Sequence, residues 1–114
     1  MNEFALLFRM DITTKEARPS PEQMEAYLTQ WHDWTDNIAA QNKLASGNHF
    51  SVDGKVIKKD NMVTEGPYTA NKMSVAGYII IKAKDFDEAV NMAKACPILQ
   101  GEGTSVEVRK IVAM

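Results

Sequence analysis

The stretch Val75-Ala76-Gly77-Tyr78-Ile79-Ile80-Ile81 decides the fold, because it is apolar at almost every position. Runs of this kind, rich in β-branched residues, are typical of a strand that is covered on both faces. If helices of the same chain cover one face, several apolar side chains remain in water on the other, which is unfavourable in a monomer. The stretch therefore predicts a central strand in a sheet whose second face packs on another chain.

Strand-like patterns precede and follow this central strand. Residues 3–10 alternate between two faces, and residues 104–112 do the same. Asp53-Gly54 lies between two further strand-like runs, residues 44–52 and 55–59, and both of its residues tolerate the positive φ of a two-residue turn. The sequence therefore predicts a hairpin centred on Asp53-Gly54 and one more strand near each end of the chain.

A long helix is predicted after the first strand. Ser20-Pro21-Glu22-Gln23 is typical of a helix start, with Ser20 as the cap and Gln23 in the capping-box position. The apolar stripe that follows predicts a helix to about Lys43, and its members are Met24, Tyr27, Leu28, Trp31, Trp34, Thr35 and Ile38. Within the stripe, we expect Trp31 in the core and Trp34 at the border of a pocket.

A second helix is predicted after the central strand. It begins at Asp85, which resembles a capping box together with Glu88, and it ends at Pro97. The order of elements is then strand, helix, hairpin, long strand, helix, strand. That order predicts one α+β domain over residues 1–114, with a ferredoxin-like split βαβ antiparallel sheet and two helices on one face. The uncovered face favours a homodimer with a cavity between or beside two sheets that pack face to face.

Composition narrows the classes of function. The chain has 114 residues, of which 45% are hydrophobic and 25% charged, and its net charge is −2. A charge this small does not favour nucleic acid, and no apolar run approaches the roughly 20 residues that cross a membrane. The N-terminal residues lack the pattern of a signal peptide, so we expect a cytoplasmic protein. The single cysteine, Cys96, is expected in the core and excludes an internal disulfide.

Four segments follow one another in a characteristic order. They are Val63-Thr64-Glu65-Gly66-Pro67-Tyr68 with Lys72, then Gly77-Tyr78, then Asp87-Glu88-Ala89 with Cys96-Pro97, and then Val106-Glu107-Val108-Arg109. Together with the Ser20-Pro21-Glu22 helix start and Gly47, they resemble the DGPF-domain branch of the YCII-related family. The branch usually has Asp-Gly-Pro-Phe where this chain has Glu65-Gly66-Pro67-Tyr68.

The resemblance spans most of the chain and implies a ferredoxin-like dimer of the dimeric α+β barrel type. Members of the wider superfamily include small lactone isomerases and a dehydrochlorinase. YCII-type members are thought to use a histidine and aspartate pair in a cavity. The branch itself implies no established reaction, although some members are associated with sigma-factor-like proteins.

The first candidate site is the polar loop before the central strand. Gly66-Pro67 fixes the shape of the loop, and around it lie a carboxylate, a phenol and an amine. In a functional interpretation, Glu65 acts as general acid or base, Tyr68 as donor and Lys72 as charge stabiliser. The alternative is a structural turn in which Glu65 and Lys72 merely pair.

The second candidate site joins the two ends of the chain. In a split βαβ sheet the first and last strands are neighbours, so Arg9 and either Glu107 or Arg109 are expected to converge on the face away from the helices. A charge on an otherwise buried strand face needs a partner. A cross-strand salt bridge that fixes the dimer and a site for a carboxylate-bearing ligand are both open interpretations.

The two histidines complete the candidates. His32 lies one helical turn before Asp36, where the pair is either a general base or an ordinary surface pair. His49 faces away from the core if Phe50 faces inward, and we assign His49 and Tyr78 to the ligand cavity. Neither histidine belongs to a metal-ligand pattern, and we expect no cofactor.

Two functions remain open. The first is a cofactor-independent proton-transfer enzyme, isomerase-like or lyase-like, that acts on a small acidic molecule in the dimer cavity. The second is a non-catalytic module, for example a regulatory one, that binds a small molecule or a partner protein. Catalysis needs a titratable group in a perturbed environment, whereas binding needs only complementary shape and charge.

Overall fold

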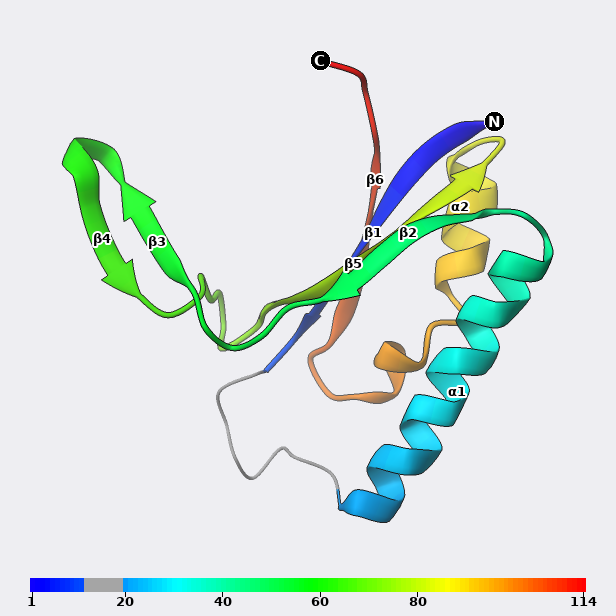
Figure 1. The fold of residues 1–114 in the computed structure, drawn as a ribbon, viewed down its shortest axis with the longest axis horizontal. Helices are drawn as coiled ribbons and strands as arrows, with labels where there is room; N and C mark the ends of the chain where they lie inside the picture. Colours follow the sequence, from blue (N-terminus) through cyan, green and yellow to red (C-terminus); the bar gives the residue numbers. More distant parts are fainter. Residues whose placement is uncertain (12–19) are drawn as a thin grey trace.

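A four-stranded antiparallel sheet forms the centre of the protein (Figure 1). The computed structural model describes residues 1–11 and 20–114. The strands lie in the order β2-β5-β1-β6, and they are β1 (Asn2–Met10), β2 (Leu44–His49), β5 (Ser74–Ala83) and β6 (Ser105–Lys110). The apolar stretch of the sequence is thus the central strand β5, paired with β2 on one side and β1 on the other.

The sheet separates a helix-covered inner face from an uncovered outer face. On β1, Phe4, Leu6 and Phe8 are buried and alternate with less buried residues, as the sequence predicts. The inner face packs on α1 (Pro21–Ala40), α2 (Phe86–Ala93) and the 3-10 helix η3 (Pro97–Gln100). The predicted α+β architecture, with an antiparallel sheet and both helices on one face, is confirmed.

The start of α1 follows the sequence closely, but its end does not. The Ser20 hydroxyl accepts a hydrogen bond from the Gln23 amide, and the Gln23 side chain accepts one from the Ser20 amide, which completes the capping box. The predicted end near Lys43 is wrong by three residues. Asn42 adopts a φ of 58°, and the amides of Asn42 and Lys43 bond back to the carbonyls of Ala39 and Ile38, respectively. This Schellman arrangement ends the helix at Ala40.

Trp34 lines a recess between α1 and α2, as predicted, but it is also the more buried of the two tryptophans of α1. Trp34 is buried and its Nε1 donates a hydrogen bond of 3.0 Å to the Met92 carbonyl on α2, whereas Trp31 is half-buried. The N-terminal end of α1 lies beyond the ends of the strands (Figure 1), so Met24 and Leu28 remain exposed. Only the C-terminal half of the apolar stripe therefore reaches the core.

A separate two-stranded hairpin projects from the sheet (Figure 1), and we call it the arm. It consists of β3 (Lys55–Lys58), the turn Lys59–Asn61 and β4 (Met62–Glu65). The predicted hairpin around Asp53-Gly54 is wrong, because β2 pairs with β5 and the turn lies at Asp60 and Asn61, both of which have positive φ.

Asp53-Gly54 instead lies at the base of the arm. The Gly54 carbonyl accepts a hydrogen bond of 2.7 Å from the Gly66 amide. A Cβ atom at position 54 would lie 3.3 Å from Pro67 Cα, so the close approach of two segments explains this glycine. Across the described ranges, 1–11 and 20–114, no helix is both long and apolar enough to span a bilayer.

Candidate functional site

The loop between the arm and β5 is held in one shape by its own backbone. Gly66 has a φ of 85°, and the buried Ser74 hydroxyl donates a hydrogen bond of 2.6 Å to the Tyr68 carbonyl. Ala70 and Met73 exchange two backbone hydrogen bonds of 2.9 Å across Asn71-Lys72, both of which have positive φ. This is the geometry of a tight two-residue turn, so the loop is rigid along most of its length.

This loop borders a recess of about 360 Å³ beside the first strand, which we call the outer recess. The residues that line it are Arg9, Pro67, Tyr68, Ala70, Met73, Ser74 and Val75. Three predicted site residues line it, since Arg9 is brought together with Pro67 and Tyr68, which are far from it in the sequence. Sequence reasoning missed Ser74, whose signal was a polar residue at the start of an otherwise apolar strand.

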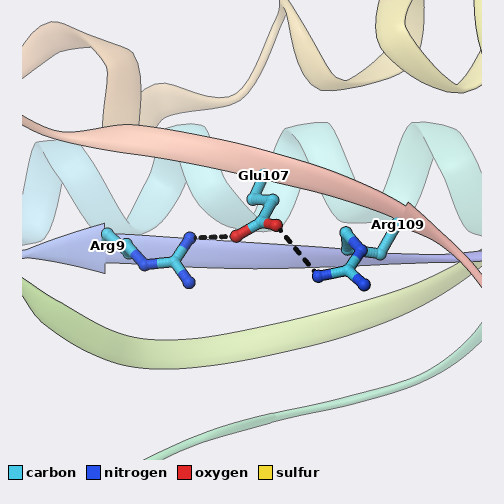
Figure 2. Close-up of polar contacts among 3 residues, drawn as sticks. All are labelled: Arg9, Glu107 and Arg109. Atoms are coloured by element: carbon cyan, nitrogen blue, oxygen red, sulfur yellow. Dashed lines mark hydrogen bonds and ion pairs between the residues drawn. The ribbon is translucent and has the colours of Figure 1, made fainter. Parts of the chain in front are cut away.

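A charged cluster of Arg9, Glu107 and Arg109 lies on the outer face of the sheet (Figure 2). Arg9 Nη1 is paired with Glu107 Oε1, and Arg109 Nη1 lies 3.2 Å from Glu107 Oε2. β1 and β6 are hydrogen-bonded neighbours, and Glu107 and Arg109 are two residues apart on one face of β6. The predicted convergence of the first and last strands is confirmed.

Figure 2 shows the Glu107 carboxylate between the two guanidinium groups. Hydrogen bonds from Arg9, and secondarily from Arg109, hold the pKa of Glu107 below its ordinary value. A carboxylate with a lowered pKa is a weak general base, so the geometry suits Glu107 for positioning the arginines. Two guanidiniums and one carboxylate leave the cluster with a net charge of +1.

The other predicted catalytic residues lie outside the outer recess. Glu65 is exposed on the arm, where its carboxylate lies 3.3 Å from Lys55 Nζ. Lys72 is exposed at the tight turn and His32 is exposed on α1. Within residues 1–11 and 20–114, no hydrogen bond or ion pair joins His32 to Asp36 or Glu65 to Lys72.

The predicted binding residues His49 and Tyr78 lie on opposite faces of the sheet. Tyr78 is on the outer face, where its hydroxyl accepts a hydrogen bond of 3.2 Å from Asn48 Nδ2 and its ring lies 5.7 Å from that of Phe50. Phe50 is therefore on the outer side and half exposed, so the condition that placed His49 outward does not hold. His49 lies on the inner side, with its ring centroid 6.4 Å from that of Trp31.

Two larger recesses lie elsewhere on the described part of the protein. One, of about 570 Å³, separates α1 from α2 and contains the ion pair between Lys43 and Glu88, whose charged atoms are 3.0 Å apart. The other, of about 630 Å³, lies between α1 and η3. We base the candidate site on the outer recess because it adjoins the cluster with excess positive charge. No group of three or more metal-ligating side chains occurs within residues 1–11 and 20–114.

Among solved structures, the chain is similar to 5-chloro-2-hydroxyhydroquinone dehydrochlorinase from Burkholderia phenoliruptrix AC1100 in its complex with 2,5-dihydroxybenzoquinone. The two share 19% identity over 91% of this chain and 90% of that chain, with a TM-score of 0.44. No curated protein matches the sequence. The family model of the YCII-related domain matches residues 6–113, from β1 to beyond β6, and the chain therefore belongs to the YCII-related family.

Proposed function

We propose that the protein binds a small carboxylate-bearing molecule in the outer recess and works as a cytoplasmic homodimer. The observation that carries the proposal is the arrangement of Arg9 and Arg109 around Glu107. The planar fork of a guanidinium matches the geometry of a carboxylate, and charge-assisted hydrogen bonds of this kind are roughly twice as strong as neutral ones.

The arginines retain donors for such a ligand. Glu107 is paired with a single nitrogen, Nη1, of each guanidinium, whereas a guanidinium carries five N–H groups. The Arg9 side chain is 37% exposed and that of Arg109 is 68% exposed. Glu107 holds Arg9 in place before the ligand arrives, which lowers the entropy cost of binding.

Two uncovered apolar surfaces support the homodimer. Leu7, Tyr78 and Ile80 lie on the outer face of the sheet, where none of the helices in the described ranges covers them. The arm exposes Ile57, Met62 and Val63, although an isolated two-stranded hairpin is only marginally stable in water. A second copy that packs on the outer face would cover the first surface and enclose the outer recess.

Proton transfer is the second candidate function, and it is favoured by the position of Tyr68 in the lining of the outer recess. Of the four residues predicted to be catalytic, Tyr68 lines the outer recess together with Arg9. Its phenol can donate a hydrogen bond or a proton to a ligand whose carboxylate is held by the arginine. Glu65, Lys72 and His32 remain predicted participants that this recess, within one protomer, does not include.

Calorimetric titration with acetate, succinate and benzoate tests the proposed binding. Arg9→Gln should weaken the best of these ligands at least tenfold, because a hydrogen bond to a charged group contributes about 1.5–3 kcal/mol. Lys58→Gln, on the exposed arm, removes the same charge far from the recess and should change the affinity less than twofold. Equal losses in the two variants would show that only net charge matters and would overturn the proposal.

Turnover is tested separately with Tyr68→Phe once a bound compound is found to react. The variant should lose turnover and keep its affinity within a few-fold. A Tyr68→Phe variant that retains full turnover contradicts a catalytic role for this phenol but leaves the binding proposal standing.

A further inference from the structure

A second recess, on the inner face of the sheet, has a different chemical character. It has a volume of about 220 Å³, lies between α1 and the edge strand β2, and we call it the inner recess. Four hydrophobic side chains and one imidazole line it, and they are Phe8, Trp31, Leu44, Ile79 and His49. It is largely apolar, and the sheet separates it from the charged cluster.

Aromatic rings form one wall of the inner recess. The rings of Phe8 and Trp31 lie 4.8 Å apart at 88°, and those of Trp31 and His49 lie 6.4 Å apart at 72°. These near-perpendicular arrangements place ring edges beside ring faces, which is the geometry that aromatic side chains offer to a further ring. The wall is therefore suited to a planar aromatic molecule.

The backbone of the central strand makes room for His49. Gly77 is directly opposite His49 in the sheet, and a Cβ at position 77 would lie 3.2 Å from His49 Cα and 3.5 Å from its Nδ1. The nearest clash would be with the Asn48 carbonyl oxygen, 2.7 Å away, so the glycine allows the backbone of β2 to approach β5 closely beside His49.

His49 also supplies a polar group to the inner recess. Asn48 and Tyr78 line it too, but their side chains hydrogen-bond to each other on the outer face of the sheet. Thr35 has a hydroxyl too, but that group already donates to the Trp31 and His32 carbonyls at 3.0 and 3.2 Å. In the described part of the chain, no hydrogen bond or ion pair involves the His49 ring. An imidazole has one nitrogen that accepts and one that donates, so it can pair with a single hydroxyl of a ligand.

Volume limits the size of this ligand. A dry apolar cavity of about 150 Å³ holds benzene, so a recess of about 220 Å³ accommodates one six-membered ring with one or two small substituents. We propose that the inner recess binds a monocyclic hydroxyaromatic compound, with its ring against Trp31 and Phe8 and its hydroxyl on His49. This site is independent of the carboxylate site on the outer face.

Titration with phenol tests the proposal, with cyclohexanol and anisole as matched probes. Phenol should bind saturably with one molecule per chain and should shift the indole N–H signal of Trp31 in a nuclear magnetic resonance spectrum. Cyclohexanol, which has the hydroxyl without the aromatic ring, and anisole, which has the ring without the hydroxyl donor, should each bind at least fivefold more weakly. Unsaturable phenol binding, or equal affinity for phenol and cyclohexanol, would overturn the proposal.

The two histidines provide a matched pair of variants. His49→Ala should weaken phenol about five- to tenfold, in line with the roughly 1 kcal/mol of one hydrogen bond. His32→Ala removes an equally exposed histidine outside the recess and should leave the affinity within twofold. Equal affinities in these two variants contradict the site. Arg9→Gln should leave phenol binding unchanged, so failure of the carboxylate proposal and failure of this one give different results.

Discussion

Arg9 on β1 and Glu107 on β6 form an ion pair across two neighbouring strands, although they are 98 residues apart in the chain. The two residues are not directly opposite each other, since Arg9 faces Ser105 and Leu7 faces Glu107. This diagonal leaves the second carboxylate oxygen of Glu107 free to contact Arg109. One carboxylate therefore fixes two arginines on the outer face.

The Glu107 pair predicts a pH-dependent contribution to stability. Because the arginines lower the pKa of Glu107 in the folded state, its contribution is present above the unfolded value of about 4.3 and is lost as the pH falls through the folded value. Urea unfolding of wild type and Glu107→Gln should show the largest difference in unfolding free energy at pH 6–7. That difference should shrink between about pH 5 and pH 3.

Glu25→Gln is the control for this experiment. Glu25 is exposed on α1, and its carboxylate makes no ion pair with any described residue. At pH 6–7 its substitution should give a smaller difference in unfolding free energy than Glu107→Gln. A Glu107→Gln difference that is constant from pH 7 to pH 3 contradicts the paired carboxylate.

The two tryptophans predict unequal losses of stability. Trp34→Phe should cost about 1–3 kcal/mol of unfolding free energy, because it leaves the Met92 carbonyl without its donor and shrinks a buried ring. Trp31→Phe should cost less, because Trp31 is half-buried. Chemical denaturation at one fixed protein concentration measures both, and a larger loss for Trp31→Phe would refute the assignment of Trp34 to the core.

Cys96 should behave as an inert core residue. Burial raises the pKa of its thiol to about 12, so almost no reactive thiolate exists near pH 8. Ellman's reagent at pH 8 should react with the folded protein at least about 100-fold more slowly than with the protein in 6 M guanidinium chloride. Rapid reaction of the folded protein would place Cys96 at an accessible site.

The arm predicts a dimer that depends on its apolar face. Ile57 and Val63 are opposite each other on the arm and are exposed in the single chain. Replacing both with lysine should shift the protein from dimer to monomer in sedimentation experiments at micromolar concentration, because the charges oppose burial against a second copy. Thr64→Lys introduces lysine on the opposite face of the same hairpin and should leave the dimer intact. A wild-type protein that sediments as a monomer would contradict the homodimer itself.

The sequence predicts the sheet well where local pattern and topology agree. Phe4, Leu6 and Phe8 identify the inner face of β1, and the capping residues of α1 stand at the expected positions. The contact between Arg9 and Glu107 is predicted because the first and last strands are neighbours in a split βαβ sheet. The hairpin at Asp53-Gly54 fails because two turn-forming pairs compete, and the pairing of β2 with the apolar strand β5 leaves the turn to Asp60-Asn61.

The candidate site could be predicted only in part, because sequence patterns do not determine how one element lies on another. Helical spacing places Trp31 and Trp34 on one stripe, but only the course of α1 across the sheet decides which ring is buried. In the same way, alternation within a strand does not relate the face of His49 on β2 to that of Tyr78 on β5, because the relation depends on the register between the two strands. The sequence grouped them in one cavity, and both residues do line the inner recess, but their side chains lie on opposite faces of the sheet and neither residue lines the outer recess.

A crystal structure of the protein with the tightest-binding carboxylate tests the central claim most directly. The account predicts that the carboxylate of the ligand lies in the outer recess, with its oxygens within hydrogen-bonding distance of Arg9 and with Tyr68 beside it. A carboxylate bound elsewhere, for example between α1 and α2, with Arg9 and Arg109 contacting only Glu107, would contradict it.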